Sequence, residues 1–509
     1  MSSFATSASP APSFAPPRRA TRALSRSSRA AATAISKRCG RPGVPAAPLP
    51  CRPRQPARRR GFPPQHPIPL SPPLRLAPWS TSMRKTPRSR VVIVDGYSTG
   101  RELLRELLDR EAECLHLQST PELPAPVANC FDRMPYDGDL GYLGTVPAAI
   151  EALATLKPDA VVAGSEWGVT FAERIAAGMA LPGNRFETIA ARRDKFEMIE
   201  AVRRSGLLVA EQAAVATVAE AHAWAKRHAA WPIVVKPMKS AGSDGVTICQ
   251  DHADIDTAFA QELGRENFMG CVNSRLLLQS FLPGPQFIVN TVSWGGRHYV
   301  SDLWSMSVAV TGSRVVPGGI HLCDPTLPRA QALIAYTLQV LSALGIENGA
   351  AHTELKWTPQ GPALIETGAR LMGAAMDEPS YARAGMRTQA NVFAEMLASC
   401  ASGREALFAA GCYGLHRQMS KVLFNFAADG RIRGTAGLSR LRELPSFHAH
   451  YRPLGRGDRV WQTGDWLACG GMVYLVHDDL RQISADIKTI RLWEARGELY
   501  DVAPCRAAA

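Results

Sequence analysis

The stretch AHTELKWTPQGPALIETGAR, residues 351–370, decides the fold that we expect for this chain. Its first part alternates polar and apolar side chains with a period of two, and its second part is mostly apolar, so we predict two short strands. The segment Thr358–Gly361, with its Pro-Gln-Gly sequence, is typical of a turn between them. In a hairpin centred on Gln360, Glu354 and Glu366 lie directly opposite each other on one face.

Two facing carboxylates are the feature of this hairpin that points to chemistry. Cross-strand side chains lie roughly 5 Å apart, where two like charges destabilise a sheet. A divalent cation bound by the oxygens of Glu354 and Glu366 removes that repulsion. Arg370 follows four residues after Glu366 and is expected to add a positive charge beside the metal. The alternative is an edge hairpin with two solvated glutamates.

Composition separates the first 90 residues from the rest of the chain. The length of 509 residues is enough for about two to four domains. Residues 1–90 contain 18 Arg and Lys and no acid, whereas the remainder carries a net charge of −5, so the basic pI gives no support for nucleic-acid binding by the folded part. The 11 Cys are scattered without a C-x-x-C, which favours free thiols in a reducing compartment. No apolar run approaches about 18 residues, so no membrane span is expected.

The N-terminal segment 1–90 has the composition of a targeting sequence. It is rich in Arg, Ser, Ala and Pro and shows no hydrophobic periodicity, which is typical of an organelle transit peptide. We predict the chloroplast as destination, because the first residues are rich in Ser and Ala and Arg begins only at Arg18. The alternatives are a mitochondrial destination, a disordered tail without a targeting role, and a cytoplasmic protein whose translation starts at Met83.

Residues 91–190 alternate strands and helices. Apolar runs predict strands at 91–95, 113–117 and 159–164, and helical patterns follow near 103–108, 145–156 and 167–179. This alternation predicts an α/β domain with a parallel, Rossmann-like sheet. The turns Asp95–Thr99 and Gly164–Glu166 should lie at the carboxyl edge of the sheet, where ligands of such domains bind. The absence of G-x-G-x-x-G leaves a dinucleotide site without support.

A helix is predicted at 192–205, and Lys195 lies near its start. A strand that contains a lysine near its end and a glycine-rich loop follow this helix. Lys236 lies near the end of a buried strand at 232–237, and the next loop contains Ser240, Gly242, Ser243 and Gly245. A Walker A loop leads into a helix, whereas this loop leads into another strand. The loop is therefore not a Walker A loop. Its glycines still allow backbone N–H groups to approach phosphates, with Lys236 adding a point charge. A flexible hairpin with surface lysines is the alternative.

The remaining sequence predicts mixed structure. Around the Pro-Gly-Pro sequence at 283–285 we expect a strand, a turn and a second strand. Helices are expected at 327–345 and 388–399, and a smaller α+β lobe with a charged helix near 478–496 is expected over 404–509.

Taken in order, these parts resemble the ATP-grasp superfamily, and more closely its carboxylate–amine (L-amino-acid) ligases. The matching segments are Asp95–Gly100, Arg193–Lys195, Val235–Pro237 with the glycine loop, Gln279–Gln286, the hairpin with Arg370, and Val473–His477. The resemblance implies an ATP-grasp fold of class α/β and α+β. It divides the chain into a transit peptide (1–90), an N-terminal Rossmann-like domain (91–190), an ATP-grasp domain (191–403) and a C-terminal α+β lobe (404–509).

The resemblance also implies roles for single residues. Lys195 is similar to the family lysine on the α-phosphate side, and Lys236 to the strand lysine that reaches the α- and β-phosphates. The loop Ser240–Gly245 is similar to the one that closes over the triphosphate. In the family, an interlobe link holds adenine through backbone groups. Gln279, Ser280, Phe281 and Leu282 match this link, and Gln279 and Gln286 match positions near adenine and ribose.

On the hairpin, Glu354 and Glu366 match the Mg2+ ligands, with Mn2+ as an alternative metal. Arg370 matches the arginine that steadies the acyl phosphate or the substrate carboxylate. The chain departs from the family at Gly368, where many members carry Asn, so one metal ligand is missing or replaced by water. It also carries Gln279 and Gln286 where Glu is common.

The implied reaction joins a carboxylate, that of an amino acid, to an amine. ATP converts the carboxylate to an acyl phosphate, the amine displaces phosphate, and an amide forms with release of ADP. The implied partners are small molecules, with no nucleic acid and no membrane, and relatives are often homodimers. Carboxylation, purine-type synthesis and ATP binding without catalysis are the alternatives.

Overall fold

The computed structural model describes residues 89–504 except 126, 129, 130, 132, 229, 312, 313, 400 and 464–468. The predicted transit peptide therefore lies outside the described residues, apart from its last two positions. Arg90 already belongs to the folded body, because it begins the first strand, and its side chain binds Glu113 at 2.9 Å. The end of the predicted C-terminal lobe, 505–509, also lies outside the described residues.

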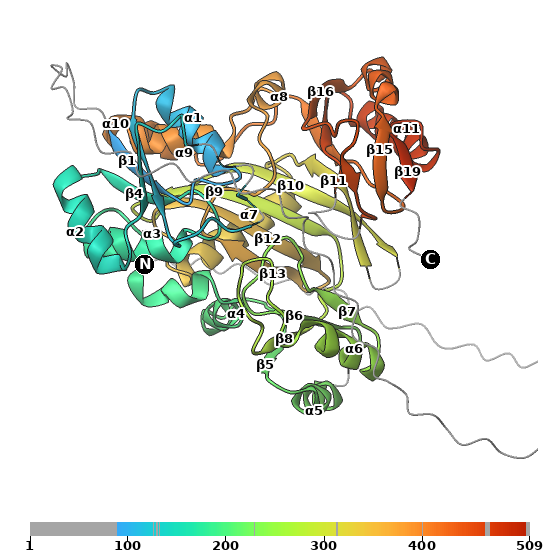
Figure 1. The fold of residues 1–509 in the computed structure, drawn as a ribbon, viewed down its shortest axis with the longest axis horizontal. Coiled ribbons are helices and arrows are strands. Elements are labelled where there is room, and N and C mark those ends of the chain that lie inside the picture. Colours follow the sequence, from blue (N-terminus) through green and yellow to red (C-terminus); the bar gives the residue numbers. More distant parts are fainter. Residues whose placement is uncertain are drawn as a thin grey trace, which may run out of the picture. The chain divides into compact units, whose positions relative to one another are not determined.

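The N-terminal domain is a parallel four-stranded sheet in the order β3-β2-β1-β4, with helices between the strands (Figure 1). The elements are β1 (Arg90–Val94), α1 (Gly100–Leu108), β2 (Glu113–Gln118), β3 (Gly138–Tyr142), α2 (Val146–Leu156), β4 (Ala160–Ala163) and α3 (Val169–Gly178). The predicted Rossmann-like sheet is confirmed. Strand β3 was not predicted, because its sequence Gly-Asp-Leu-Gly-Tyr lacks a run of apolar residues.

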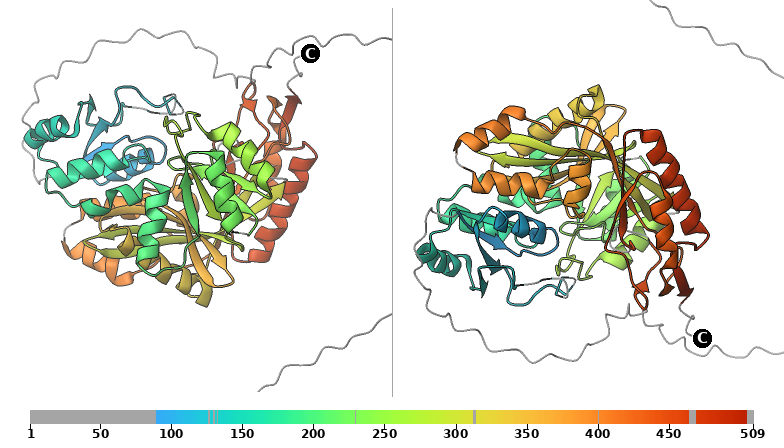
Figure 2. Two further views of the ribbon diagram at one scale, coloured as in Figure 1. Left: turned by 90° about the horizontal axis from the view of Figure 1, so that it is seen from below. Right: turned by 90° about the horizontal axis from the view of Figure 1, so that it is seen from above.

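A small lobe, residues 207–282, follows the 3₁₀ helix η1 (Phe186–Arg192) and α4 (Lys195–Arg204). Helix α4 begins at Lys195 rather than at 192, because the Asp194 side chain caps it by accepting from two backbone N–H groups. The lobe is an antiparallel sheet in the order β5-β8-β6-β7, and its helices pack on the sheet around a separate core (Figure 2). Its elements are β5 (Gln212–Val215), α5 (Val218–His228), β6 (Ile233–Pro237), β7 (Thr247–Cys249), α6 (His252–Glu262) and β8 (Leu276–Ser280).

The largest sheet has eight antiparallel strands in the order β13-β12-β9-β10-β11-β14-β18-β16. These strands are β9 (Gln286–Trp294), β10 (Arg297–Thr311), β11 (Arg314–Leu322), β12 (Gly349–Thr358), β13 (Gly361–Gly368), β14 (Gln418–Leu423), β16 (Phe447–Tyr451) and β18 (Met472–His477). Helices α7 (Pro328–Ala343) and α9 (Gln389–Ala398) pack on the first strands of this sheet. The core of the body therefore lies between these helices and the sheet.

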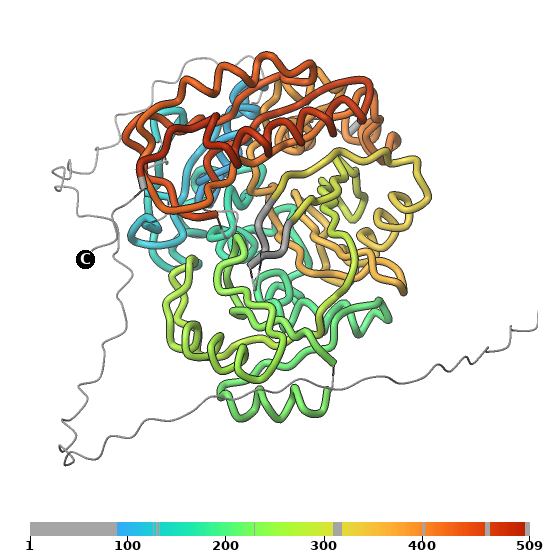
Figure 3. The backbone as a smooth tube through the Cα atoms, turned by 90° about the vertical axis from the view of Figure 1, so that its right-hand side faces the viewer, coloured from blue at the N-terminus to red at the C-terminus, as the bar shows by residue number. Residues whose placement is uncertain are grey.

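The C-terminal part continues the same sheet. The predicted boundary at 404 falls inside α10 (Ala401–Ala410), and β14, β18 and β16 extend the large sheet beyond β11. The last part of the chain also has its own core, in which α11 (Leu480–Ala495) packs beside β14 and β18. Figure 3 shows the backbone of this part in red. The other elements of this part are β15 (Gly430–Gly434), η2 (Ala436–Glu443), β17 (Arg459–Val460) and β19 (Asp501–Pro504). The short helix α8 (Glu378–Arg383) lies between β13 and α9 in the chain and belongs to the main core.

The chain enters the small lobe after α4 and leaves it before β9, and both connections touch the hairpin β12–β13. On the way in, Val209 forms a parallel bridge with Leu364 of β13. On the way out, the carbonyl of Pro285 accepts a hydrogen bond from the N–H of Trp357 on β12 at 2.9 Å. Gly284 lies so close that a Cβ there would be 2.0 Å from the Trp357 carbonyl oxygen. The two strands of the hairpin thus each hold one crossing.

None of the helices within the described part of the chain has the length and apolarity needed to span a bilayer.

Candidate active site

The hairpin β12–β13 places Glu354 and Glu366 opposite each other, as predicted. Near the turn Thr358 pairs with Gly361, so the hairpin is not centred on a single residue. A β-bulge at Ile365 adds one residue to β13 and brings Glu366 into register with Glu354. The facing pair is confirmed, and it depends on a bulge that the sequence pattern did not indicate.

Glu354 is held by two neighbours on its own face of the sheet. Its Oε2 accepts a hydrogen bond from Gln286 Nε2 at 2.7 Å, and its Oε1 lies 3.2 Å from His352 Nε2. Gln286, predicted beside adenine and ribose, therefore also fixes a candidate metal ligand. His352 was not among the predicted residues, although its position two residues before Glu354 on the same strand places both on one face.

Lys195 connects the hairpin to the glycine-rich loop. It is the first residue of α4, and its Nζ lies 3.1 Å from Glu366 Oε2 and donates to the Ser240 carbonyl at 2.7 Å. Burial alone raises the pKa of Glu366, but Lys195 and Lys236 together hold that pKa below its usual value. Glu366 is therefore ionised and available as an oxygen ligand.

Lys236 lies near the end of β6, with only 5% of its surface exposed. Burial lowers the pKa of Lys236 to about 8; Lys195 adds to this effect, and Glu366 and Glu354 oppose it. Any further negative charge that approaches Lys236 stabilises its charged form and raises its pKa. Lys195, Lys236 and the two glutamates therefore form one electrostatic cluster, as the ATP-grasp resemblance implies.

The loop between β6 and β7 is held in place by Asp244, which binds one side chain of the loop and one from beyond α6. Ser240 Oγ donates to Asp244 Oδ2 at 2.8 Å, and Arg265 Nη2 donates to Asp244 Oδ1 at 2.8 Å. Three loop residues have positive φ, namely Gly242, Ser243 and Gly245. At Gly245 a Cβ would also lie 2.9 Å from Pro237 Cγ and 2.5 Å from a Glu262 oxygen, so glycine is favoured there. The sequence reasoning missed Asp244, although it lies inside the predicted loop.

The predicted adenine segment forms the end of β8 and the start of the link to the large sheet. Gln279 Nε2 donates to Gln212 Oε1 at 3.0 Å, and Ser280 Oγ accepts from the Glu211 N–H at 3.0 Å. These two side chains are thus bonded within the small lobe. The half-buried residues Phe281 and Leu282 follow, and the adenine contact of this segment stays a prediction.

Glu166 joins Arg370 to the N-terminal domain. It lies in the turn after β4, its Oε2 accepts from Arg370 Nε at 2.7 Å, and its Oε1 pairs with Arg193. Burial alone raises the pKa of Glu166, but Arg193, Arg370 and Lys195 lower it to about 2. The sequence placed Glu166 at the carboxyl edge of the sheet without a role. Its partner Arg370 lies 204 positions away, and no local pattern connects the two.

Gly368 leaves the space that this ion pair occupies. A Cβ at position 368 would lie 3.1 Å from Glu166 Oε2 and 3.3 Å from Arg370 Cζ. A side chain there would require Glu166 and Arg370 to shift. The absence of the family Asn is therefore matched by a carboxylate brought in from the N-terminal domain.

The two hairpin carboxylates fit a divalent cation as part of its coordination shell. Among residues 89–504, with the gaps given above, no group of three or more His, Cys, Asp or Glu side chains is already arranged to hold a metal. Mg2+ in nucleotide sites is usually bound by one or two carboxylates together with phosphates and water. Glu354 and Glu366 are side by side and partly exposed, and they meet that requirement.

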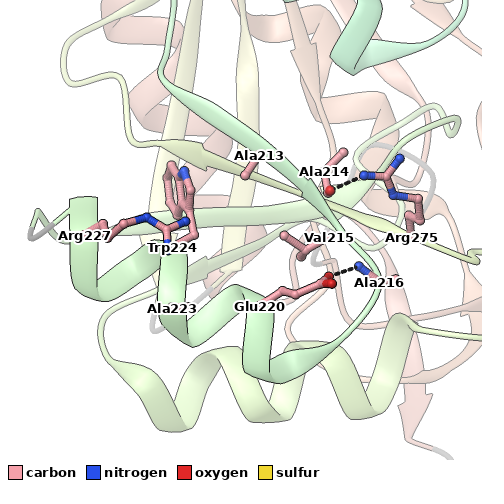
Figure 4. Close-up of a pocket in the computed structure, with 9 residues that line it drawn as sticks. All are labelled: Ala213, Ala214, Val215, Ala216, Glu220, Ala223, Trp224, Arg227 and Arg275. Atoms are coloured by element: carbon pink, nitrogen blue, oxygen red, sulfur yellow. Dashed lines mark hydrogen bonds between the residues drawn. The ribbon is translucent and has the colours of Figure 1, made fainter.

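A groove of about 470 Å³ lies elsewhere, along β5 in the small lobe (Figure 4). Arg275 and Glu220 line this groove. Arg275 donates to the carbonyl of Ala214 on β5, and Glu220 accepts from the N–H of Ala216 just after β5. None of the predicted site residues lines this groove. The chemistry is therefore placed at the hairpin.

The fold, the lysines and the paired glutamates define an ATP-grasp enzyme, and comparison with known proteins agrees. Residues 229–378 match the ATP-grasp domain family. Dapdiamide A synthase from Enterobacter agglomerans is 31% identical over 416 residues, which cover 79% of this chain and 95% of that protein. This chain belongs to the ATP-grasp superfamily, whose members generally use ATP and Mg2+.

Solved structures share the fold. L-amino acid ligase from Bacillus licheniformis superposes with a TM-score of 0.64 at 17% identity, covering 83% of this chain and 100% of that one. Phosphoribosylglycinamide synthetase from Anaerococcus prevotii gives a TM-score of 0.56 at 14% identity, covering 82% and 100%. At these identities the likeness shows the fold alone.

Proposed function

We propose that the protein is an ATP-dependent ligase that joins the carboxylate of an amino acid to an amine through an acyl phosphate. The products are an amide, ADP and phosphate. The observation that carries this proposal is the position of Arg370. It is fixed by Glu166 directly beside the cluster of Lys195 and the paired glutamates.

Two similarities support the choice of an amide-forming reaction. The relative at 31% identity is a synthase of dapdiamide A, and the structure with a TM-score of 0.64 is an L-amino acid ligase. The other structural neighbour given above is a phosphoribosylglycinamide synthetase, so the fold by itself does not choose the substrates.

The main obstacle to the first step is repulsion, because a carboxylate must approach the γ-phosphate of a polyanion. Lys195 and Lys236 supply positive charge on the side of the triphosphate, at the ends of two different elements. A divalent cation at Glu354 and Glu366 supplies further charge neutralisation when bound.

Arg370 has the position to steady the reacting carboxylate and the acyl phosphate. Its Nε is bonded to Glu166, and one Nη is bonded to the Leu371 carbonyl at 2.8 Å. The guanidinium is therefore fixed in orientation before a substrate arrives, which is the condition for electrostatic catalysis. The amine then attacks the activated carbonyl and phosphate leaves, without the need for a protein nucleophile.

A phosphate-release screen tests this function. The protein is incubated with ATP, Mg2+ and pairs of amino acids, and separate arms contain bicarbonate or a purine-type amine with its acid partner. Phosphate release that requires both a carboxylate and an amine, with an amide detected by mass spectrometry, is the expected result. Tight ATP binding in calorimetry without turnover in any arm contradicts the proposal.

We also propose that residues 1–90, nearly all outside the described part of the chain, direct the protein to the chloroplast. The support is their Arg- and Ser-rich, acid-free composition. A fusion of residues 1–90 to a fluorescent protein should accumulate in chloroplasts. Accumulation in mitochondria or in the cytosol contradicts this destination.

A further inference from the structure

One row of cross-strand partners crosses four neighbouring strands of the large sheet and ends at the site. In this row Asp302 of β10 pairs with Asn290 of β9, Asn290 with His352 of β12, and His352 with Gly368 of β13. The members of the row are also linked by side-chain hydrogen bonds, from Asp302 through Asn290 to His352. At its end, His352 Nε2 lies 3.2 Å from Oε1 of Glu354. Asp302, Asn290 and His352 are all buried.

The direction of these hydrogen bonds fixes the proton on the imidazole ring. The Asp302 carboxylate accepts from Ser301 Oγ at 2.9 Å, from Trp304 Nε1, and from Asn290 Nδ2. The amide of Asn290 therefore turns its oxygen toward His352, whose Nδ1 lies 2.8 Å away and must donate. A neutral imidazole then carries a lone pair on Nε2, on the side of Glu354.

A lone pair that faces a carboxylate oxygen is unfavourable unless a cation lies between them. Histidines that bind metals show this arrangement, because their second nitrogen donates to a carboxylate or carbonyl that fixes the tautomer. Here Asn290 provides that carbonyl, and Asp302 orients Asn290. The alternative is an imidazolium that donates from both nitrogens and forms an ion pair with Glu354.

We propose that His352 is the third protein ligand of the divalent cation, in place of the Asn that many family members carry at position 368. This inference rests on the proposed function, because it needs the metal–nucleotide complex to bind at the hairpin. His352 and Gly368 are direct cross-strand partners, so His352 lies on the strand next to the position that lacks the family ligand, and its Nε2 is 3.2 Å from Oε1 of Glu354. Glu366, which faces Glu354 from β13 and lies 3.1 Å from Lys195 Nζ, would be the other carboxylate of the set.

A nitrogen ligand has a consequence for the choice of metal. Mg2+ is a hard cation that prefers oxygen, whereas imidazole suits first-row transition metals. The protein should therefore prefer Mn2+ over Mg2+ in the presence of ADP. Replacement of His352 by Gln should reduce the preference for Mn2+ over Mg2+ by about tenfold. Substitutions of residues around a metal site typically change metal affinity by about 10- to 100-fold.

Pulsed electron paramagnetic resonance on Mn2+ with ADP and the full-length protein tests the ligand directly. The spectrum of wild-type protein should show echo modulation from a coordinated nitrogen. Labelling of histidine with 15N should change the modulation, which distinguishes imidazole from adenine or lysine nitrogen. This comparison needs no substitution, so it does not depend on the folding of a variant.

Two substitutions complete the experiment. His352→Gln should lose the histidine modulation while Mn2+ remains bound. His298→Gln is the matched control, because His298 lies on β10, hydrogen-bonded to Ser293 at 2.7 Å and outside the site, and should leave the modulation unchanged.

The outcomes separate this inference from the proposed function. Bound Mn2+ without histidine modulation in wild-type protein overturns the ligand role and supports the imidazolium ion pair, while the proposed function stands. Histidine modulation that persists in His352→Gln also overturns the assignment. Failure of Mn2+ and Mg2+ to bind at all with ADP overturns the metal site and the proposed function together.

Discussion

Glu366→Gln is the substitution that tests the site most directly. It keeps the size of the side chain and removes one negative charge from between Lys195 and Lys236. In the native protein Glu366 Oε2 lies 3.1 Å from Lys195 Nζ, and both lysines lower the pKa of the Glu366 carboxyl against the effect of burial. The variant therefore loses a candidate metal ligand and leaves two cations without their common partner.

The size of the effect follows from this geometry. At 3.1 Å and an effective dielectric constant of about 20, the attraction between Lys195 and Glu366 is about 5 kcal/mol before solvent screening. Water reduces this value, because the Glu366 side chain is 28% exposed. Removal of one preorganised electrostatic group typically costs about 3–4 kcal/mol in the transition state. We therefore expect kcat to fall by about 10²- to 10³-fold.

The assay is phosphate release at saturating ATP with the substrates found in the screen. Glu347→Gln is the matched control, since Glu347 forms an ion pair with Arg185 at 2.7 Å outside the site and undergoes the same change of charge. The control should keep kcat within about twofold of wild type. Thermal unfolding should show both variants folded. A Glu366→Gln protein with wild-type kcat and wild-type metal dependence refutes the assignment of the hairpin as the metal site.

Burial lowers the pKa of Lys236 to about 8, so this lysine is neutral above that pH in the free protein and must take up a proton when ATP binds. The dissociation constant of ATP should therefore rise between about pH 8 and 10 in calorimetry, and Lys236→Arg should abolish the rise. Gly245→Ala, at φ +71°, would place a Cβ 2.9 Å from Pro237 Cγ and 2.5 Å from Glu262 Oε2, and it should lower the free energy of unfolding by about 2–3 kcal/mol in denaturant titrations, whereas Gly206→Ala, at φ +76° in open space, should lower it by about 1 kcal/mol. Glu166→Gln should raise the KM for the carboxylate substrate more than the KM for ATP, because it frees Arg370; equal rises in steady-state kinetics contradict this role.

The sequence was sufficient for those parts of the site that depend on local pattern. The alternation of residues on the first strand of the hairpin placed Glu354 on one face, and the Gly-rich sequence after Lys236 indicated the loop. Apolar runs likewise identified three of the four strands in the N-terminal sheet. In each case the signal lies within about ten residues, where periodicity and turn residues determine the structure.

The rest depends on which distant segments meet, and no local pattern contains that information. Glu166 and Arg370 are far apart in sequence, and Asn290 and His352 belong to strands separated by several elements. The bulge at Ile365 reconciles the register at the turn with the pairing of Glu354 and Glu366. It depends on both ends of the hairpin, so the sequence pattern of one strand does not indicate it. The functional residues that were missed are those whose role depends on a contact with a residue distant in sequence and not on the residues next to them in the chain.

The two crossings into the small lobe rest on the same strands that carry the candidate metal ligands. Val209 is attached to β13, and Pro285 is attached to β12 next to the close approach of Gly284. Both connections of the small lobe are therefore attached to the hairpin, one to each of its strands. The placement of the small lobe and the spacing of Glu354 and Glu366 depend on the same two strands.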